Sequence, residues 1–130
     1  MSQLAEGKLG AILAIGHETS LRGSGRSLAD LLAATRYREL RSDLSVERLA
    51  LEIELHSRLV DEWERYSEDK RTSGGWWLLR KGTMWEVGRF VEGDPANVEA
   101  ETFGSAWIAT ATFILRELDF WADVAPEGHR

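Results

Sequence analysis

The stretch GGWWLLRKGTMWEVGRF, residues 74–90, places three tryptophans among seventeen residues around a Lys-Gly junction. It is rich in aromatic and β-branched residues that alternate with others, a composition typical of strands. Lys81-Gly82 near its middle supplies the turn chemistry that joins two strands. A second break, GDPAN at 93–97, precedes another strand-like segment at 98–103. Because Gly, Asp, Pro and Asn favour turns, these signals predict a three-stranded antiparallel meander.

Helical patterns flank the predicted sheet on both sides. Ser27 is a good N-cap for a short helix over 27–37. Ser45 can cap a longer helix over 45–70, whose apolar residues recur at spacings of three and four, and we expect it to be the central helix. A final helix over 105–124 carries one continuous apolar face. The sequence therefore predicts an α+β fold with two N-terminal helices, the meander, and a closing C-terminal helix packed on the sheet.

The first 26 residues are the least defined part of what we expect to be a single domain over residues 1–130. The apolar run LGAILAIG at 9–16 fits a buried strand or a helical turn, and its length does not decide between them. It is far too short to span a bilayer, and no clear signal peptide is present. The absence of cysteine suits a reducing compartment. We therefore expect a soluble cytoplasmic protein that does not associate with membranes.

The formal net charge of −6 is unevenly distributed along the chain. Residues 1–41 carry six Lys and Arg against four Asp and Glu, or +2, while residues 42–130 carry ten against eighteen, or −8. Such an acidic body argues against a nucleic-acid partner, because phosphate binding needs a basic face. It favours a basic protein partner, since opposite charge speeds the encounter of two proteins.

His56 lies within the apolar stripe of the 45–70 segment. As a functional residue it could act as a base or a ligand, oriented by Glu52 one turn earlier. A satisfied core or boundary histidine is the favoured interpretation, because His17 and His129 both lie in loop-like terminal segments. With no cysteine and no two histidines at ligand spacing on one helix, we expect neither a metal nor an organic cofactor.

Alternation divides the side chains of the predicted sheet between two faces. The first face, which we expect under the helices, collects apolar positions from all three strands: Trp77, Leu79, Trp85, Val87, Val91, Val98 and Ala100. The second face contains Leu78 and the candidate partner-binding residues, which are Trp76, Arg80, Glu86, Phe90, Glu99 and Glu101. Rings within an acidic rim are what a tight protein interface needs. The alternative is that the N-terminal segment covers this second face within the chain.

Two stretches, WWLLRKGTMWEVGRFVEG at 76–93 and VEAETFGSAWIATATFILREL at 98–118, carry a family resemblance. The matching positions are Trp77, Trp85, Gly88, Glu92, Phe103, Ala109 and Leu118. Over residues 74–120, about half of the chain, the order resembles that of small bacterial immunity proteins of polymorphic toxin systems. In those proteins a hairpin with a tryptophan in its second strand leads to an acidic third strand, a phenylalanine and a closing amphipathic helix. The resemblance implies a non-catalytic inhibitor that neutralises a cognate toxin by stoichiometric surface complementarity.

Two other functional classes remain open from the sequence. A secretion chaperone, usually dimeric, would hold a client segment on an apolar sheet face. A small enzyme would use Glu86, Glu99 and Glu101, which we place on one sheet face, as its carboxylates. Paired carboxylates divide acid and base roles only when their environments separate their pKa values.

A possible dimer contact lies on the predicted closing helix. On a helical projection, Phe113 and Phe120 fall on the side opposite to the apolar stripe that the sheet should cover. Two rings on an outward face form an apolar ridge, which is often self-complementary across a two-fold axis. We therefore expect this ridge to contact a second copy of the chain. The alternative is that residues 9–16 lie over the same ridge within one chain.

Overall fold

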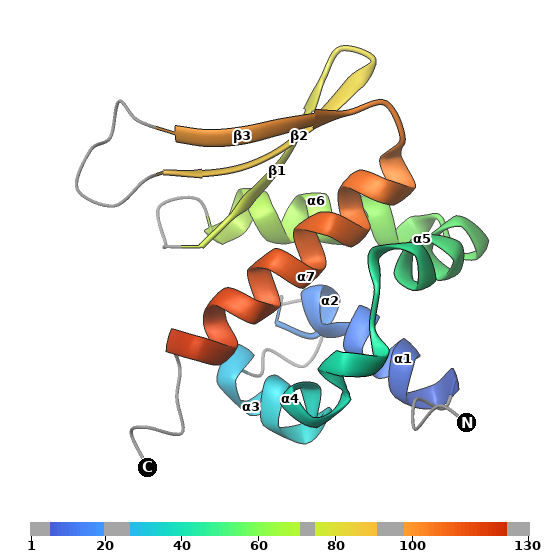
Figure 1. Cartoon of the computed structure of the whole chain (residues 1–130), viewed down its shortest axis with the longest axis vertical. Coiled ribbons are helices and arrows are strands. Elements are labelled where there is room, and N and C mark those ends of the chain that lie inside the picture. Colours follow the sequence, from blue (N-terminus) through green and yellow to red (C-terminus); the bar gives the residue numbers. More distant parts are fainter. Residues whose placement is uncertain (1–5, 20–26, 71–74, 91–97, 125–130) are drawn as a thin grey trace.

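The computed structural model describes residues 6–19, 27–70, 75–90 and 98–124. These residues form an α+β fold, in which helices precede and follow a three-stranded antiparallel sheet, as the sequence predicts (Figure 1). The helices before the sheet are α1 (Glu6–Leu13), α2 (Ile15–Glu18), α3 (Leu28–Ala34), α4 (Tyr37–Leu40), the 3-10 turn η1 (Arg41–Asp43), α5 (Val46–Leu55) and α6 (Arg58–Lys70). The strands are β1 (Trp77–Lys81), β2 (Met84–Phe90) and β3 (Val98–Phe103), and the closing helix is α7 (Ala106–Val124).

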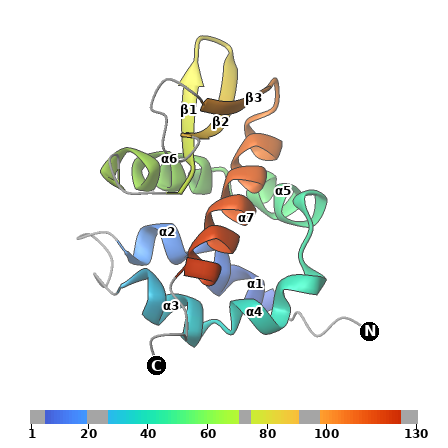
Figure 2. The same ribbon diagram turned by 60° about the vertical axis from the view of Figure 1, so that its left-hand side comes forward.

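The closing helix α7 runs through the middle of the molecule (Figure 1). The sheet lies on one side of it, and α1 to α4 lie on the other side, as the turned view also shows (Figure 2). Residues 109–115 of α7 are buried without interruption, so this part of the helix is covered on all sides. A helix that is apolar all round belongs inside a protein. The expectation that the 45–70 segment forms the central helix is therefore wrong.

The 45–70 segment is also two helices, α5 and α6, and not one. His56 ends α5 with φ −132° and ψ 71°, outside the helical region. Its side chain is 51% exposed, so it is not the core or boundary histidine that the apolar stripe indicates. Leu51 and Leu55 are 65% and 74% exposed, where the periodicity suggested burial. The physical reason is that α5 packs beside α7 while α6 packs under the sheet, and one straight helix cannot follow both surfaces.

The N-terminal apolar run at 9–16 is helical and belongs to α1 and α2. Leu9, Ile12, Leu13 and Ile15 are buried in the core. Trp63 of α6 is fully buried beside them, and its Nε1–H donates to the backbone oxygen of Leu13 over 2.8 Å. The run therefore covers the helical layer and does not cover the second face of the sheet. In the described segments, no helix has both the length and the apolar character needed to cross a membrane.

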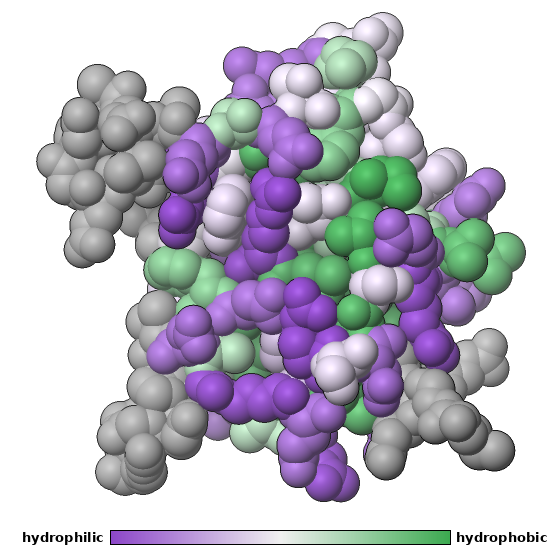
Figure 3. All heavy atoms as spheres, viewed as in Figure 1, coloured by the Kyte–Doolittle hydropathy of each residue, from purple (hydrophilic) through white to green (hydrophobic). Residues whose placement is uncertain are grey.

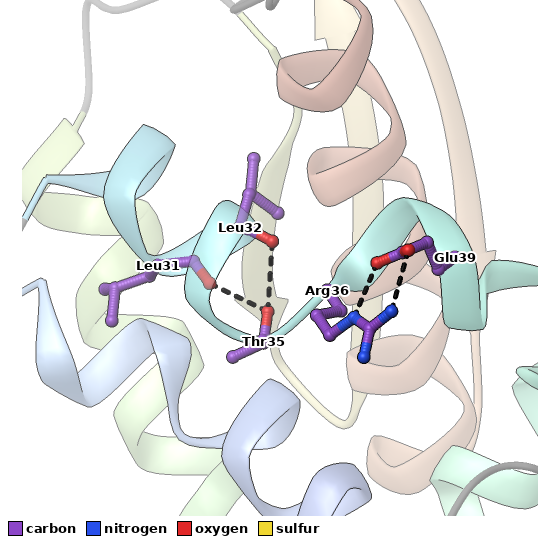
Figure 4. Close-up of polar contacts among 5 residues, drawn as sticks. All are labelled: Leu31, Leu32, Thr35, Arg36 and Glu39. Atoms are coloured by element: carbon purple, nitrogen blue, oxygen red, sulfur yellow. Dashed lines mark hydrogen bonds and ion pairs between the residues drawn. The ribbon is translucent and has the colours of Figure 1, made fainter.

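Polar side chains mark the helix ends that the sequence predicts. Ser27 Oγ accepts from the backbone N–H of Asp30, and Ser45 caps α5 in the same way. At the other end of α3, Thr35 Oγ1 donates to the carbonyl oxygen of Leu31 over 2.7 Å (Figure 4). Arg36 then adopts a left-handed conformation with φ 58°, and its guanidinium donates to both carboxylate oxygens of Glu39. This left-handed residue turns the chain from α3 into α4.

The hairpin forms where the sequence places it, and Trp85 and Val87 of β2 face the helices as expected, but β1 and β3 are assigned to the wrong face. Gly82 has φ 64°, which favours glycine, and the two-residue turn aligns Lys81 with Met84. Leu78 consequently pairs with Val87, and both are fully buried against the helices. A shift of one residue exchanges the two faces of a strand. The positions predicted to share the first face are therefore divided between both faces.

The face opposite the helices carries Trp77 and Leu79 of β1, together with Glu86, Gly88 and Ala100. Leu79 is 38% exposed, so it does not lie in the core as expected. Trp77 lies across Gly88, where an added Cβ atom would come within 2.7 Å of the indole ring. We call this side the outer face of the sheet, and the other side the helix-facing side.

Candidate functional site

A cleft lies between β3 and α7 on the helix-facing side of the sheet. It has a volume of about 380 Å³ and is lined by Trp76, Val87, Glu99, Ala100, Glu101 and Arg116. Hydrophilic side chains lie across the surface between these two elements in the space-filling view (Figure 3). We refer to this site as the β3–α7 cleft. It contains three of the six residues that the sequence predicts to bind a partner, namely Trp76, Glu99 and Glu101.

Two arginine–glutamate pairs surround the ring of Trp76. Arg89 Nε donates to Glu99 Oε1 over 2.9 Å, and Arg116 Nη2 donates to Glu101 Oε1 over 2.8 Å. The guanidinium carbons of Arg89 and Arg116 each lie 5.1 Å from the centroid of the indole ring. Arginine within about 6 Å of a ring gains a cation–π attraction as well as its charge-assisted hydrogen bonds. The cleft therefore presents an aromatic surface with charges of both signs in defined positions.

Both glutamates of the cleft remain accessible although they point to the helix-facing side. The side chains of Glu99 and Glu101 are each 55% exposed. The third strand is an edge strand of the sheet, and α7 lies beneath only part of it (Figure 1). A carboxylate can accept about four hydrogen bonds, so each retains acceptor capacity beyond its arginine. These two groups are available to a partner that approaches the edge of the sheet.

The buried side chain of Glu117 on α7 holds Trp76 in place. Its Oε1 accepts from the backbone N–H of Trp76 over 2.8 Å, and its Oε2 accepts from Tyr66 Oη and Trp121 Nε1 over 2.7 and 2.8 Å. Burial and the neighbouring Glu117 raise the pKa of the Tyr66 hydroxyl far above its ordinary value. Gly75 has φ 92°, and a Cβ atom there would lie 2.5 Å from Glu117 Oε1. The chain therefore needs glycine immediately before Trp76.

The other predicted partner-binding residues lie away from the cleft. Arg80 lies over the ring of Trp85 at 4.4 Å and pairs with Glu64 of α6 at 3.0 Å. Glu86 lies on the outer face, where it accepts from Trp77 Nε1 over 2.9 Å. Phe90 belongs to β2, but its side chain lies outside the described part of the chain. The structure thus divides the predicted set between the cleft, the α6 side and the outer face.

The carboxylates proposed for an enzyme do not form one group. The register places Glu86 opposite Leu79 on the outer face, while Glu99 pairs with Arg89 on the helix-facing side. Acid and base roles cannot be divided between side chains on opposite faces of a sheet. Among the residues that the structure describes, no three His, Asp or Glu side chains are grouped to hold a metal ion.

The predicted outward ridge on the closing helix does not exist. Phe113 is fully buried and packs edge-on against the ring of Trp63, with a centroid distance of 6.1 Å. Phe120 is partly buried and lies edge-on to the neighbouring Trp121 at 5.0 Å. The prediction fails because α6 packs on the side of α7 that Phe113 occupies. Trp63 and Tyr66 of α6 contact the Phe113 ring, and the apolar side chains of residues 9–16 belong to the same buried core.

The sequence did not predict the part that three residues of this region play: Arg89, Arg116 and Glu117. Arg116 and Glu117 are adjacent charged residues inside the mostly apolar run ATATFILRELDFW at 109–121. A pair of charges in such a run is a signal that the helix meets polar partners, because buried charges need hydrogen bonds. Arg89 carries no comparable signal, since an arginine on a strand is usually solvated.

A second cleft, of about 490 Å³, lies where α1 and α2 meet the junction of α5 and α6. His17 and His56 line it, together with Glu52 and Glu62. Glu52 Oε2 lies 3.6 Å from His56 Nε2, the neighbour that the functional alternative for His56 assigns to it. Both partners are solvent-accessible, and the distance exceeds that of a good hydrogen bond.

Comparisons of the chain with protein-family models, with curated proteins and with solved structures gave no match. The fold and the cleft define the molecule as an α+β protein with a mixed-charge cleft beside the edge strand β3. A fold by itself does not determine function, which depends on the residues of the site.

Proposed function

We propose that this protein is a non-catalytic protein-binding inhibitor, similar to the immunity proteins that neutralise bacterial toxins. Its partner would be a basic protein domain, bound through the β3–α7 cleft and the adjacent edge of the sheet. The observation that carries the proposal is the arrangement around Trp76, where an anchored ring lies beside two accessible carboxylates. Aromatic and arginine side chains at the centre of a contact surface supply most of the energy of protein interfaces.

The charge of the molecule supports a basic partner. The α5–α6 segment, residues 46–70, contains eight Asp and Glu against four Lys and Arg, or −4. On both helices, most of the Asp and Glu residues are exposed. An acidic surface accelerates association with a basic partner and disfavours acidic competitors, including nucleic acids. The charge thus supports the class of partner, and the cleft supports the place of contact.

The test begins with capture of partners from the source cells on the immobilised protein. The captured protein is expressed alone in a surrogate host, where it should stop growth, and then together with this chain, which should restore growth. The purified pair should form a one-to-one complex by light scattering. A captured protein that is harmless, or whose toxicity this chain does not relieve, would refute the proposal.

A matched pair of variants locates the contact. The Glu99→Gln, Glu101→Gln double variant removes two carboxylates from the cleft, and we expect it to weaken the complex at least tenfold. The Glu54→Gln, Asp69→Asn double variant makes the same change of charge at exposed positions of α5 and α6. It should leave affinity nearly unchanged. Equal effects of the two pairs would mean that only net charge matters and that the cleft is not the site.

The secretion-chaperone alternative predicts a different outcome of the same capture. A chaperone would retain a secreted client without neutralising any toxicity, and it would release that client at an export apparatus. The exposed apolar groups on the outer face, Leu79 and Met84, are the surface such a client would use. Loss of capture in a Leu79→Ser, Met84→Ser variant, with the Glu99 and Glu101 variant unaffected, would favour the chaperone.

A further inference from the structure

The two edges of the sheet differ in how their backbone groups are satisfied. The sheet order is β1-β2-β3, so β1 and β3 are the edge strands. On the β1 edge, the backbone N–H of Leu78 donates to Ser67 Oγ of α6 over 2.8 Å. Among the described residues, no strand pairs with the outer edge of β3. A free edge exposes a row of unpaired backbone groups that can template another strand.

The register identifies which groups of β3 point outward. The two-residue turn makes Lys81 and Met84 a hydrogen-bonded pair, and such pairs alternate with non-bonded pairs along an antiparallel ladder. In β2, every second residue from Trp85 to Arg89 therefore directs its N–H and C=O toward β3. Their partners on β3 are Phe103, Glu101 and Glu99. The backbone groups of Ala100 and Thr102 consequently point away from β2, toward the open edge.

The same alternation gives an independent check on β1. It directs the N–H of Leu78 away from β2, toward the outer edge of β1. That is the group that Ser67 Oγ binds. The phase of the ladder is thus consistent across the sheet, and the backbone groups of Ala100 and Thr102 pair with no strand among the described residues. Both residues have small, exposed side chains that leave these groups accessible.

Resting on the proposed function above, we propose that the partner donates an extended segment that pairs antiparallel with β3. The segment carries basic side chains at two positions separated by one residue, opposite Glu99 and Glu101. These positions are non-hydrogen-bonded pairs on the new ladder, where opposing side chains lie closest. The backbone hydrogen bonds supply affinity and the two carboxylates select a basic sequence.

The carboxylates also exclude a second copy of this chain as the occupant. In a two-fold antiparallel pairing of β3 with itself, the ladder phase allows two registers with long overlap, centred on Ala100 or on Glu101. The first sets Glu99 opposite Glu101, and the second sets Glu101 opposite itself. Like charges directly opposite each other destabilise a strand pair. A basic segment meets the same positions with favourable charge.

Amide hydrogen exchange on the full-length, isotope-labelled chain tests the pairing directly. The probe is the capped peptide Gly-Thr-Lys-Val-Lys-Thr-Gly at millimolar concentration, and its control replaces both lysines by glutamate. In the free protein, the amides of Ala100 and Thr102 should exchange at least tenfold faster than that of Glu101. The lysine peptide should slow them at least tenfold, and the glutamate peptide should not. Titration into Glu99→Gln, Glu101→Gln should remove the difference between the peptides.

Four results would overturn the inference. Slow exchange at Ala100 and Thr102 in the free protein would mean that the chain itself covers the edge. Slowing at high protein concentration without peptide would identify a second copy as the occupant. Equal effects of the two peptides would remove the role of the carboxylates. No effect of the lysine peptide would remove the pairing.

A backbone variant separates this inference from the proposed function. Ala100→Pro deletes an outward N–H without removing a donor from the β2–β3 ladder, and proline is tolerated on edge strands. Ala100→Ser keeps the N–H and is the control. If a captured toxin binds Ala100→Pro as tightly as wild type, the strand pairing is wrong and the inhibitor function stands. If the lysine peptide protects the edge but no captured protein is a neutralised toxin, the pairing stands and the proposed function fails. Circular dichroism verifies that both variants fold, and Thr102→Pro repeats the test at the second outward group.

Discussion

The contact between Gly16 and Trp63 predicts opposite effects for two glycine-to-alanine substitutions. A Cβ atom at Gly16 would lie 2.9, 3.0 and 3.1 Å from Cδ2, Cε2 and Cε3 of Trp63. Carbon atoms in contact are normally about 3.5–4.0 Å apart. Alanine at position 16 therefore requires the indole or the helix to move by roughly 0.5–1 Å. At Gly10 in α1, by contrast, an added Cβ meets no atom within 4 Å.

The indole has little freedom to move. Trp63 is fully buried, and its Nε1–H is held by the carbonyl oxygen of Leu13. The rings of Tyr66 and Phe113 lie edge-on to it at 5.1 and 6.1 Å. Overpacking of this kind costs about 1–3 kcal/mol, while replacing glycine by alanine in a helix returns at most about 1 kcal/mol. Gly16→Ala should lower the free energy of unfolding by about 1–2 kcal/mol, whereas Gly10→Ala should raise it by about 0.5–1 kcal/mol.

Urea denaturation followed by tryptophan fluorescence measures both variants under the same conditions. The midpoint should fall for Gly16→Ala and rise for Gly10→Ala, with unchanged slopes. A Gly16→Ala protein as stable as wild type would show that α2 does not pack on Trp63 as described. Equal gains at both positions would show that the two sites respond only to helix propensity, and the close approach would then be refuted.

Three further predictions concern other sites in the helical layer and the anchor of the cleft. Arg36 has φ 58°, a conformation that glycine adopts without strain and a β-branched residue does not. Arg36→Gly should therefore keep the urea midpoint of unfolding, while Arg36→Val should lower it. Equal midpoints would contradict the left-handed conformation. Burial, with an acidic neighbour, raises the pKa of both tyrosines of the chain, Tyr37 and Tyr66, above the ordinary value of 10.0. The contribution of these tyrosines to stability should therefore be fully present below pH 10 and fall as the pH rises beyond it, because only the unfolded state then loses their protons. A tyrosinate absorbance that titrates near pH 10 without loss of circular dichroism would refute this. Tyr66→Phe should lower the free energy of unfolding by about 1–2 kcal/mol and Glu117→Gln by about 2–3 kcal/mol. The second effect is larger because Glu117 accepts from several buried donors at once. A Glu117→Gln protein with wild-type stability would show that this carboxyl does not anchor Trp76.

Local signals in the sequence predicted the elements well. Ser27 and Ser45 cap helices as expected, and Gly82 forms the hairpin turn. The order of three antiparallel strands followed by a closing helix is also confirmed. These features depend on neighbours within about four residues, so composition and spacing are sufficient to identify them.

Features that depend on packing between distant segments were not predictable in the same way. No residue near His56 indicates a helix break, because the break depends on the different surfaces against which α5 and α6 pack. The apolar run at 9–16 fits a strand or a helix equally, and only its docking against Trp63 selects the helix. A helical projection places Phe113 outside because it assumes one covered face, whereas residues 109–115 of α7 are covered on all sides.

The candidate site shows how a small register error moves an interface. Glu99 and Glu101 were grouped correctly with Trp76, because β1 and β3 were assigned in phase with each other, but β2 was assigned one residue out of phase with both. The three residues therefore share the helix-facing side of the sheet and not its outer face. A partner that contacts both carboxylates and the ring cannot lie flat on the outer face; it must approach along β3, where the strand extends beyond α7. The same strand directs the backbone groups of Ala100 and Thr102 outward, where no described strand pairs with them, so the accessible carboxylates and the outward backbone groups lie on one edge.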